Sequence, residues 1–504
     1  MAKKITSCDI QMYTMGTGDC FLLSFKGDGD QKPRFKLMID CGVQSISGDN
    51  MRPYAMKIIE ETEGEVDALL ITHEHQDHVL GFQRCKKEFK EHLKVKELWL
   101  PWTENESDAL VKEWKDEFGK KKKALAMATD LLNKHTKSDL FEQIYNVGPR
   151  GARSFNARKG ISNSLMELSN LNTEPMGAAG DYIGGLKGME VVKNDLERER
   201  LRFLETGTVL EDIEGLQNIR IYVLGPPKMW KDVKTHHGKD GETYKHNKEL
   251  EFVRGFSALP FEEDDSESDP FEKVHITEYN ADAKTKYAKS KNKAFSKIKE
   301  SYTKPENNYR RIDFDWLMSA ANLSLRLTKG MNNLSAVLAI EFIDSGKVML
   351  FPGDAEFGSW RSWHEIDWDE KGKDGQTHLT TDLLNRTVFY KVAHHLSHNG
   401  TARELGMDLM TNKDLVAMAT LDYEVISPSW KNTMPNRALL KDLLKKTSGR
   451  FIVLNPEGLH VDKANTTKLT DEIDQRLGDL SQAKQKEFKV DRNEFFVQYT
   501  VNGS

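Results

Sequence analysis

The stretch Ile71-Thr72-His73-Glu74-His75-Gln76-Asp77-His78 follows a largely apolar run and places three imidazoles and a carboxylate within six residues. The run itself, residues 66–71, is short and ends in a β-branched residue, so it predicts a buried strand. The histidine cluster therefore begins where a strand passes into a loop. Ligands at such a place are held by a rigid element and stay open to substrate.

The spacing within this cluster suits two metal ions. His73 and His75 are two residues apart and can point the same way, whereas the adjacent Asp77 and His78 can diverge toward a second ion. Neutral imidazole and carboxylate suit Zn²⁺, Mn²⁺ or Fe²⁺ better than Ca²⁺. The alternative is a polar loop in which histidines cluster by chance, but the chain has only 15 histidines in 504 residues.

This motif resembles the signature of the metallo-β-lactamase superfamily, and further landmarks of that fold follow in the expected order. They are a glycine turn and strand at 15–23, a strand at 35–42 carrying Asp40, a strand at 348–356 carrying Asp354, and a strand at 390–395 ending in two histidines. The resemblance implies an α/β fold, the four-layer αββα sandwich, with large, partly helical insertions.

Three features resemble one branch more closely, the hydrolase domain of the DNA-uptake competence protein and the phosphorylcholine-esterase-like members. They are Val-Leu-Gly-Pro-Pro at 223–227, Asn-Asn-Leu-Ser at 332–335, and the pair His394-His395 followed by Ser397. Unlike many superfamily members, the strand at 219–224 ends without a histidine that would complete the first metal's ligands.

The resemblance implies a role for each motif residue and two divalent metal ions, Zn or Mn, as cofactors. The first ion is expected on His73 and His75, and Asp354 is expected to bridge the two ions. The expected ligands of the second ion are Asp77, His78 and His395.

In esterase-like relatives the first histidine of the pair and a nearby glutamate face the substrate, which implies His394 and Glu356 here. Neighbouring strand residues point to opposite faces, but this alternation does not say which histidine is the ligand; we prefer His395. Asp40 is expected to accept hydrogen bonds that orient the ligand loop, although a simple turn aspartate is an equal alternative.

The expected chemistry is hydrolysis by a metal-bridged hydroxide. The candidate catalytic residues are Asp77, His394, Glu356 and His398. His394 or His398 would protonate the leaving group, because an unperturbed histidine has a pKa near neutrality. For His398, a surface position in a turn is the alternative.

Composition indicates a chain that is polar for its size. Hydrophobic residues make up 38%, charged residues 30%, and the net charge is -6. No segment approaches the roughly 20 apolar residues of a membrane span, and no signal-peptide core follows Met1. We therefore expect a cytoplasmic protein without membrane contact, with its four cysteines as buried thiols.

The long interval between His78 and Asp354 predicts insertions. We expect the first half of the core at 1–103, a mainly helical insertion at 104–215, a core strand at 216–228, a polar, charged insertion at 229–318, and the second half of the core with C-terminal elements at 319–504.

One lysine-rich segment, 284–304, has aromatic residues between its lysines. Lys289, Lys291 and Lys293 are candidate substrate contacts, since lysines can follow a phosphate backbone while rings stack on bases. A solvated helix is the alternative.

Three functions fit these observations. The first is a phosphodiesterase or nuclease acting on nucleic acid or another phosphodiester. The second is a hydrolase of a small ester, lactone or choline-like phosphoester. The third is a partner-gated effector or interaction protein whose insertions dock another protein. Fold resemblance alone does not choose between them.

Overall fold

The computed structural model describes residues 4–44, 46–115, 187–235, 238–239, 241–244, 330–368, 379–422, 426, 434–453, 488–490 and 495–503. The chain divides into two compact units. One comprises residues 1–122, 170–250 and 326–504, and the other comprises residues 123–169 and 251–325. All described residues belong to the first unit.

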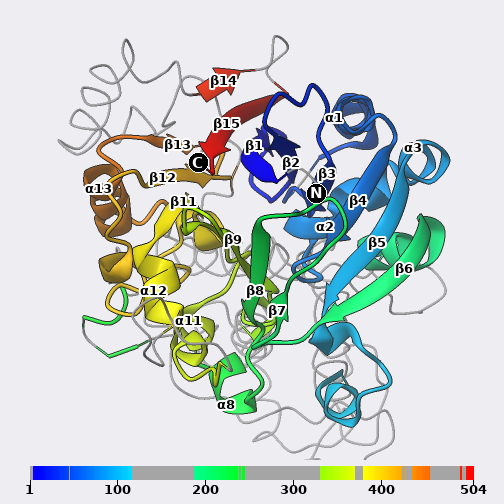
Figure 1. Cartoon of the computed structure of the whole chain (residues 1–504). Coiled ribbons are helices and arrows are strands. Elements are labelled where there is room, and N and C mark those ends of the chain that lie inside the picture. The colour runs from blue at the N-terminus through cyan, green and yellow to red at the C-terminus, as the bar shows by residue number, and fades with distance from the viewer. Residues whose placement is uncertain are drawn as a thin grey trace, which may run out of the picture. The chain divides into compact units, whose positions relative to one another are not determined.

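The first sheet has eight strands in the order β14-β15-β1-β2-β3-β4-β5-β6 (Figure 1). Its pairs from β14 to β3 are antiparallel, and those from β3 to β6 are parallel. The strands are β1 Ile5–Tyr13, β2 Phe21–Gly27, β3 Phe35–Ile39, β4 Glu65–Leu70, β5 Lys94–Pro101, β6 Glu197–Leu204, β14 Phe488–Val490 and β15 Phe496–Asn502.

The second sheet has seven strands in the order β13-β12-β11-β10-β9-β8-β7. Its pairs from β13 to β10 are parallel, and those from β10 to β7 are antiparallel. The strands are β7 Val209–Leu210, β8 Ile219–Gly225, β9 Val337–Phe342, β10 Lys347–Phe351, β11 Thr387–Lys391, β12 Val416–Ala419 and β13 Phe451–Val453.

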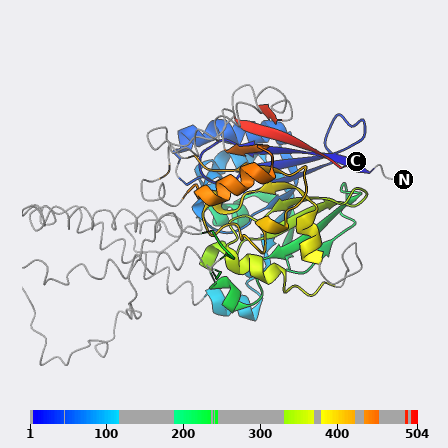
Figure 2. The same cartoon turned by 90° about the vertical axis from the view of Figure 1, so that its left-hand side faces the viewer.

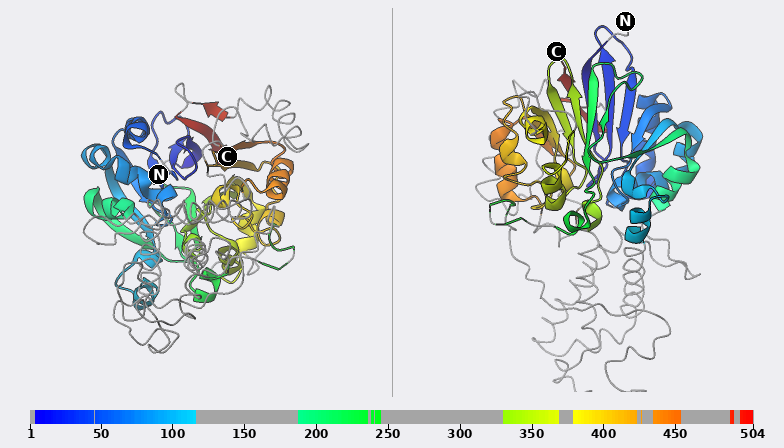
Figure 3. Two further views of the ribbon diagram at one scale, coloured as in Figure 1. Left: turned by 180° about the vertical axis from the view of Figure 1, so that it is seen from behind. Right: turned by 60° about the horizontal axis from the view of Figure 1, so that its bottom comes forward.

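The two sheets pack face to face and are covered by helices on their outer faces (Figure 3). The core between the sheets includes Phe21 of β2 and Phe351 of β10, whose rings lie edge to face at 6.1 Å. The first sheet is covered by α1 Gly48–Thr62, α2 Gln76–Arg84 and α3 Lys86–His92. The shorter elements beside it are η1 Trp102–Glu104, α7 Lys187–Glu190 and η2 Val191–Asp195.

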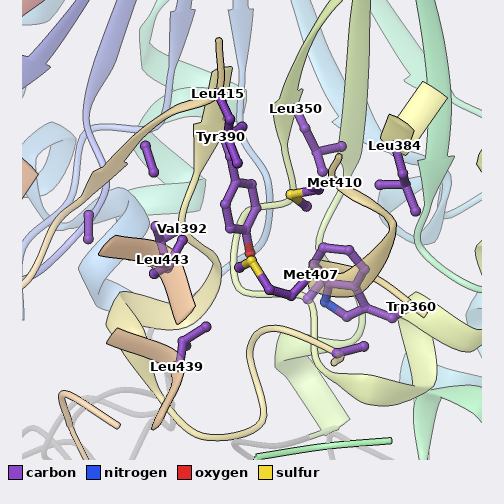
Figure 4. Close-up of a cluster of buried hydrophobic side chains, with 14 of the residues drawn as sticks. Leu350, Trp360, Leu384, Tyr390, Val392, Met407, Met410, Leu415, Leu439 and Leu443 are labelled. Carbon is purple, nitrogen blue, oxygen red and sulfur yellow. The ribbon is translucent and has the colours of Figure 1, made fainter. Parts of the chain in front are cut away.

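The outer face of the second sheet has a core of its own (Figures 2 and 4). Tyr390 of β11 packs there with Met407 and with Leu443 of α13. The helical elements on this side are α8 Trp230–Val233, α11 Phe357–Trp363, α12 Leu379–Asn385, η5 Ala393–Leu396, η6 Met407–Leu409 and α13 Arg437–Lys446. Four layers, helix, sheet, sheet and helix, thus result, as the sequence predicts for the αββα sandwich.

The expected boundary at residue 215 differs from the structure. β6 and β7 fall within the insertion expected at 104–215, yet β6 pairs with β5 of the first sheet and β7 with β8 of the second. An exposed edge strand buries little on either face, so β6 can carry the charged run Glu-Arg-Glu-Arg. This run has no apolar alternation, and the sequence therefore did not predict a strand here.

No helix within the described ranges is long and apolar enough to cross a membrane. The four cysteines, Cys8, Cys20, Cys41 and Cys85, are free thiols and are buried.

Candidate metal centre

Three loops at one end of the first sheet are joined by backbone hydrogen bonds. The amide of Asp19 donates to the carbonyl of Asp77 at 2.8 Å, and the amide of Cys41 donates to the carbonyl of His78 at 2.9 Å. Gly42 makes this approach possible, because a Cβ at that position would lie 2.1 Å from the amide nitrogen of His78. The motif that follows β4 is therefore held by backbone contacts rather than left as a free loop.

The second sheet brings its own loops to the same place. The amide of Ala336 donates to the carbonyl of Thr72 at 2.9 Å, which joins the start of β9 to the end of β4. Gly353, with φ of 56°, follows β10, and a Cβ there would lie 3.1 Å from the Cβ of Thr72. This close approach delivers Asp354 to the histidine motif.

Four buried side chains converge at this junction, two from each half of the fold. Oδ2 of Asp354 lies 3.2 Å from Nε2 of His78 and 3.4 Å from Nε2 of His395, and Nε2 of His395 lies 3.3 Å from Oδ2 of Asp77. Tetrahedral ligands about 2.0–2.1 Å from one ion lie about 3.3 Å from one another. This quartet, Asp77, His78, Asp354 and His395, therefore fits the ligand set of a divalent metal ion.

The tautomer of His78 follows from its other neighbour. Nδ1 of His78 lies 2.7 Å from Oδ2 of Asp40, a carboxylate that also accepts from the amide and the hydroxyl of Thr72. A carboxylate only accepts, so Nδ1 keeps its proton in the neutral ring, and Nε2 is the nitrogen that can bind a metal ion at the quartet. Asp40 thus has the geometry of an orienting group.

The charges of the quartet depend on one another. Burial opposes a proton on His395, but Asp354 outweighs it and raises the pKa of His395 to about 9. His78 has its pKa raised well above the ordinary value, because the charges of Asp354 and Asp40 outweigh burial there. Conversely, His395 and His78 hold the pKa of Asp354 well below its usual value despite burial. A site that is this anionic at its centre favours a bound cation.

His73 and His75 lie together beside the quartet. Nε2 of His73 is 3.0 Å from Nδ1 of His75, and both side chains are buried. Nδ1 of His73 lies 3.2 Å from the hydroxyl of Thr72 and 3.3 Å from that of Ser335. Because Thr72 donates to Asp40, its oxygen accepts from Nδ1 of His73, which leaves Nε2 of His73 facing His75. Burial lowers the pKa of both histidines, so their neutral, ligating form is favoured.

The histidine pair does not lie on a strand, contrary to the sequence expectation. β11 ends at Lys391, and His394, His395 and Leu396 have φ of 47°, 48° and 67°. Left-handed backbone costs an L-residue roughly 1–2 kcal/mol. This turn directs His395 to the quartet and leaves His394 outside it, where its Nδ1 lies 3.6 Å from Oε1 of Glu356.

Glu356 and His394 share a neighbour that the sequence did not single out as a site residue. Nδ2 of Asn332 donates to Oε1 of Glu356 at 2.9 Å and lies 3.3 Å from Nε2 of His394. Glu356 is fully buried, whereas the side chain of His394 is 13% exposed. His398 is partly buried, three residues beyond His395. Asn332, Glu356 and His394 thus form a polar group beside the quartet.

The remaining candidates lie elsewhere. Lys289, Lys291 and Lys293 are outside the described residues. Two residues at the quartet, Asp19 and Lys391, were not predicted as site residues. Both lie in strand-end motifs that are visible in the sequence. Each side chain is only 2% exposed, and this burial, which the sequence does not show, distinguishes them from ordinary polar residues at strand ends.

Comparison with known proteins agrees with this architecture. Residues 30–133 match the family model described as the metallo-beta-lactamase superfamily, a span that contains Asp40 and the motif His73–His78. Together with the two packed mixed sheets, this match gives the chain a metallo-β-lactamase sandwich fold.

No curated protein matches the chain. A crystal structure of unliganded yeast PDE1 is similar over 89% of this chain and 97% of that chain, at 8% sequence identity and a TM-score of 0.30. A TM-score this low supports no argument about fold or function.

Proposed function

We propose that this protein is a dinuclear metal-dependent hydrolase and that its substrate is a phosphodiester, which would make it a phosphodiesterase or nuclease. The observation that carries the proposal is the convergence of the quartet beside the pair His73 and His75. The pair offers two potential metal ligands and the quartet offers four, all of them buried. Six such ligands suit two divalent cations better than one.

The protein's own groups would divide the work. When bound, two divalent ions would supply an activated water and offset the charge that develops on the attacked phosphoryl group. His73 and His75 would hold one ion, Asp77, His78 and His395 the other, and Asp354 would reach both. Asp40 would keep His78 in its ligating tautomer through the 2.7 Å contact to Nδ1.

His394 is the candidate proton donor to the leaving group. It is the part-exposed member of the polar group beside the quartet, so its ring can meet a substrate, while Glu356 lies 3.6 Å from its Nδ1 and Asn332 lies 3.3 Å from its Nε2. His398 lies in the same loop and is the second candidate. Phosphodiesters need both an activated water and a protonated leaving group, and this arrangement can provide both.

A direct assay tests the proposal. Metal-stripped protein would be supplied with Mn²⁺ or Zn²⁺ and given bis-p-nitrophenyl phosphate, single- and double-stranded DNA, and RNA. We expect turnover by the wild type and none by Asp354→Ala. Glu341→Gln is the matched control, because Glu341 is a buried carboxylate that pairs with Arg386 away from the quartet. Turnover without metal, or equal turnover by Asp354→Ala, would refute the proposal.

A small ester, lactone or choline-like phosphoester is the second candidate substrate. The polar group of Asn332, Glu356 and part-exposed His394 beside the quartet favours a substrate that carries a hydrogen-bond donor or a cationic group there. Cleavage of the small diester without cleavage of polymer would select this class. If the metal-loaded protein hydrolyses none of these substrates, a protein gated by a partner would be favoured instead.

A further inference from the structure

We propose that Lys391, Asp19 and Thr420 form a positioning network that fixes two of the metal ligands at once, Asp354 and His395. The inference rests on the proposed function, since it assumes that the quartet holds a metal ion. All three side chains are buried, and each contacts the next, so that the network closes a ring with the two ligands.

One arm of the ring acts on Asp354. Nζ of Lys391 lies 3.6 Å from Oδ1 of Asp354 and donates to the carbonyl of Gly353, the preceding residue, at 2.9 Å. Oδ2 of Asp354 faces the two histidines of the quartet instead. The ammonium group therefore attracts one carboxylate oxygen and leaves the other for the cations. Without Lys391, the carboxylate could rotate and offer either oxygen.

The other arm acts on His395. Oγ1 of Thr420 donates to Oδ1 of Asp19 at 2.6 Å and lies 2.9 Å from Nδ1 of His395. A hydroxyl has a single proton, and the carboxylate takes it, so Oγ1 accepts from Nδ1–H of His395. In the neutral ring, Nε2 of His395 is consequently the nitrogen without a proton, and it faces Asp77 and Asp354. Thr420 sets this tautomer as Asp40 sets that of His78.

Asp19 joins the two arms. Its Oδ2 pairs with Lys391 while its Oδ1 accepts from Thr420. Its backbone amide also donates to the carbonyl of Asp77, a third quartet residue. A buried lysine needs such a partner, because an uncompensated charge in the interior is costly. The pair Lys391–Asp19 thus couples the opening loop of the first sheet to the end of β11.

The decisive experiment compares metal affinity with stability. Zn²⁺ affinity and stoichiometry would be measured by chelator competition on metal-stripped protein, and the melting temperature would be measured without metal. Thr420→Val keeps the volume and removes the hydroxyl, and Thr420→Ser restores the hydroxyl. Lys391→Met removes the ammonium, and Arg386→Met is its control, because Arg386 precedes the same strand and pairs with buried Glu341 away from the quartet.

We expect Thr420→Val to weaken binding of one of two zinc ions by roughly 10- to 100-fold and to lower the melting temperature, because Asp19 and His395 lose a buried partner. Thr420→Ser should bind zinc as the wild type does. Lys391→Met should weaken binding of the same ion, whereas Arg386→Met should lower only the melting temperature. If Lys391→Met does not fold, Thr420→Val decides alone. Wild-type affinity in Thr420→Val would overturn the inference and leave the proposed function intact. A wild type that binds no divalent ion would overturn the proposed function itself.

Discussion

Nε2 of His78 and Oδ2 of Asp354 lie 3.2 Å apart, although one residue follows β4 of the first sheet and the other follows β10 of the second. The contact places an imidazole nitrogen and a carboxylate oxygen at the separation of two ligands of one ion. Because the two residues belong to different sheets, a metal bound between them would also cross-link the sandwich.

Replacing Asp354 with Ala should therefore affect activity and metal-dependent stability together. We expect kcat/KM to fall by about 10³-fold or more, since the loss of a group that organises charge at the reacting centre has costs of this size. Added Zn²⁺ should raise the melting temperature of the wild type but not of the variant. A variant that zinc stabilises as much as it stabilises the wild type would contradict the bridging role.

Metal binding should release protons, and affinity should rise with pH. The pKa of His395 is raised to about 9, so His395 is protonated at pH 7 in metal-stripped protein, and that of His78 is raised well above its ordinary value by Asp354 and Asp40. A ligand must lose its proton, so for His395 each pH unit below about 9 should lower the apparent affinity about tenfold. Titration calorimetry in buffers of different ionisation enthalpy would count the protons. Heats that do not depend on the buffer would exclude the prediction.

The adjacent Asn332 and Asn333 should respond to mutation in different ways. Asn332 contacts Glu356 and His394, so Asn332→Ala should lower kcat by about 10²-fold through misplacement of these groups and leave zinc affinity unchanged. The comparison would be made by steady-state kinetics beside chelator competition. A loss of zinc affinity in this variant would assign Asn332 to the metal centre instead.

Asn333, in contrast, has a structural position. Nδ2 of its side chain donates to the carbonyls of Val233 and Thr235, and its Oδ1 accepts from the backbone amides of Glu356 and Ser359. Removing a fully buried side chain with this many partners leaves several backbone groups unsatisfied. Asn333→Ala should lower the free energy of unfolding by about 2–4 kcal/mol in urea titrations, and an unchanged value would show that water replaces the lost bonds.

Gly42→Ala should damage the metal centre by forcing two loops apart. The added methyl group would lie 2.1 Å from the amide nitrogen of His78, a backbone atom that cannot move away by itself. We expect a loss of about 3 kcal/mol or more in unfolding free energy and weaker zinc binding.

Gly48→Ala is the control for this substitution, since its methyl group would meet only the carbonyl of Arg84 at 3.5 Å. Gly48 begins α1, where alanine is favoured, so this variant should be neutral or slightly more stable. Equal behaviour of the two variants in chemical unfolding would mean that the approach of Gly42 to His78 is not tight.

β4 and the cluster at its end are the part of the fold that the sequence predicted best. An apolar strand followed by His-x-His-x-Asp-His is local in sequence, so periodicity and spacing predicted both the strand and the cluster at its end. The strands at β3, β8, β10 and β11 were expected from the resemblance of their motifs to the metallo-β-lactamase superfamily. β6 was missed because its charged residues give no apolar alternation, and only pairing with β5 makes it a strand.

The choice between His394 and His395 depended on the tertiary structure. The two histidines are adjacent in sequence, and strand alternation does not apply to them because β11 ends at Lys391. The left-handed turn that separates their directions is held by the packing of buried Leu396 in the core of the second sheet. Residues other than glycine disfavour positive φ, so no local sequence pattern predicts this turn.

By itself, then, the sequence determined the strand at β4 and the motif at its end, because both are set by neighbouring residues. The resemblance of its motifs to the metallo-β-lactamase superfamily implied the sandwich fold and the candidate ligands. Tertiary structure alone decided which nitrogen of each histidine faces the quartet. It also brought Lys391, Asp19 and Thr420 together from three distant strand ends. Tautomers and buried charges depend on partners in space, and those partners meet only when the two sheets pack.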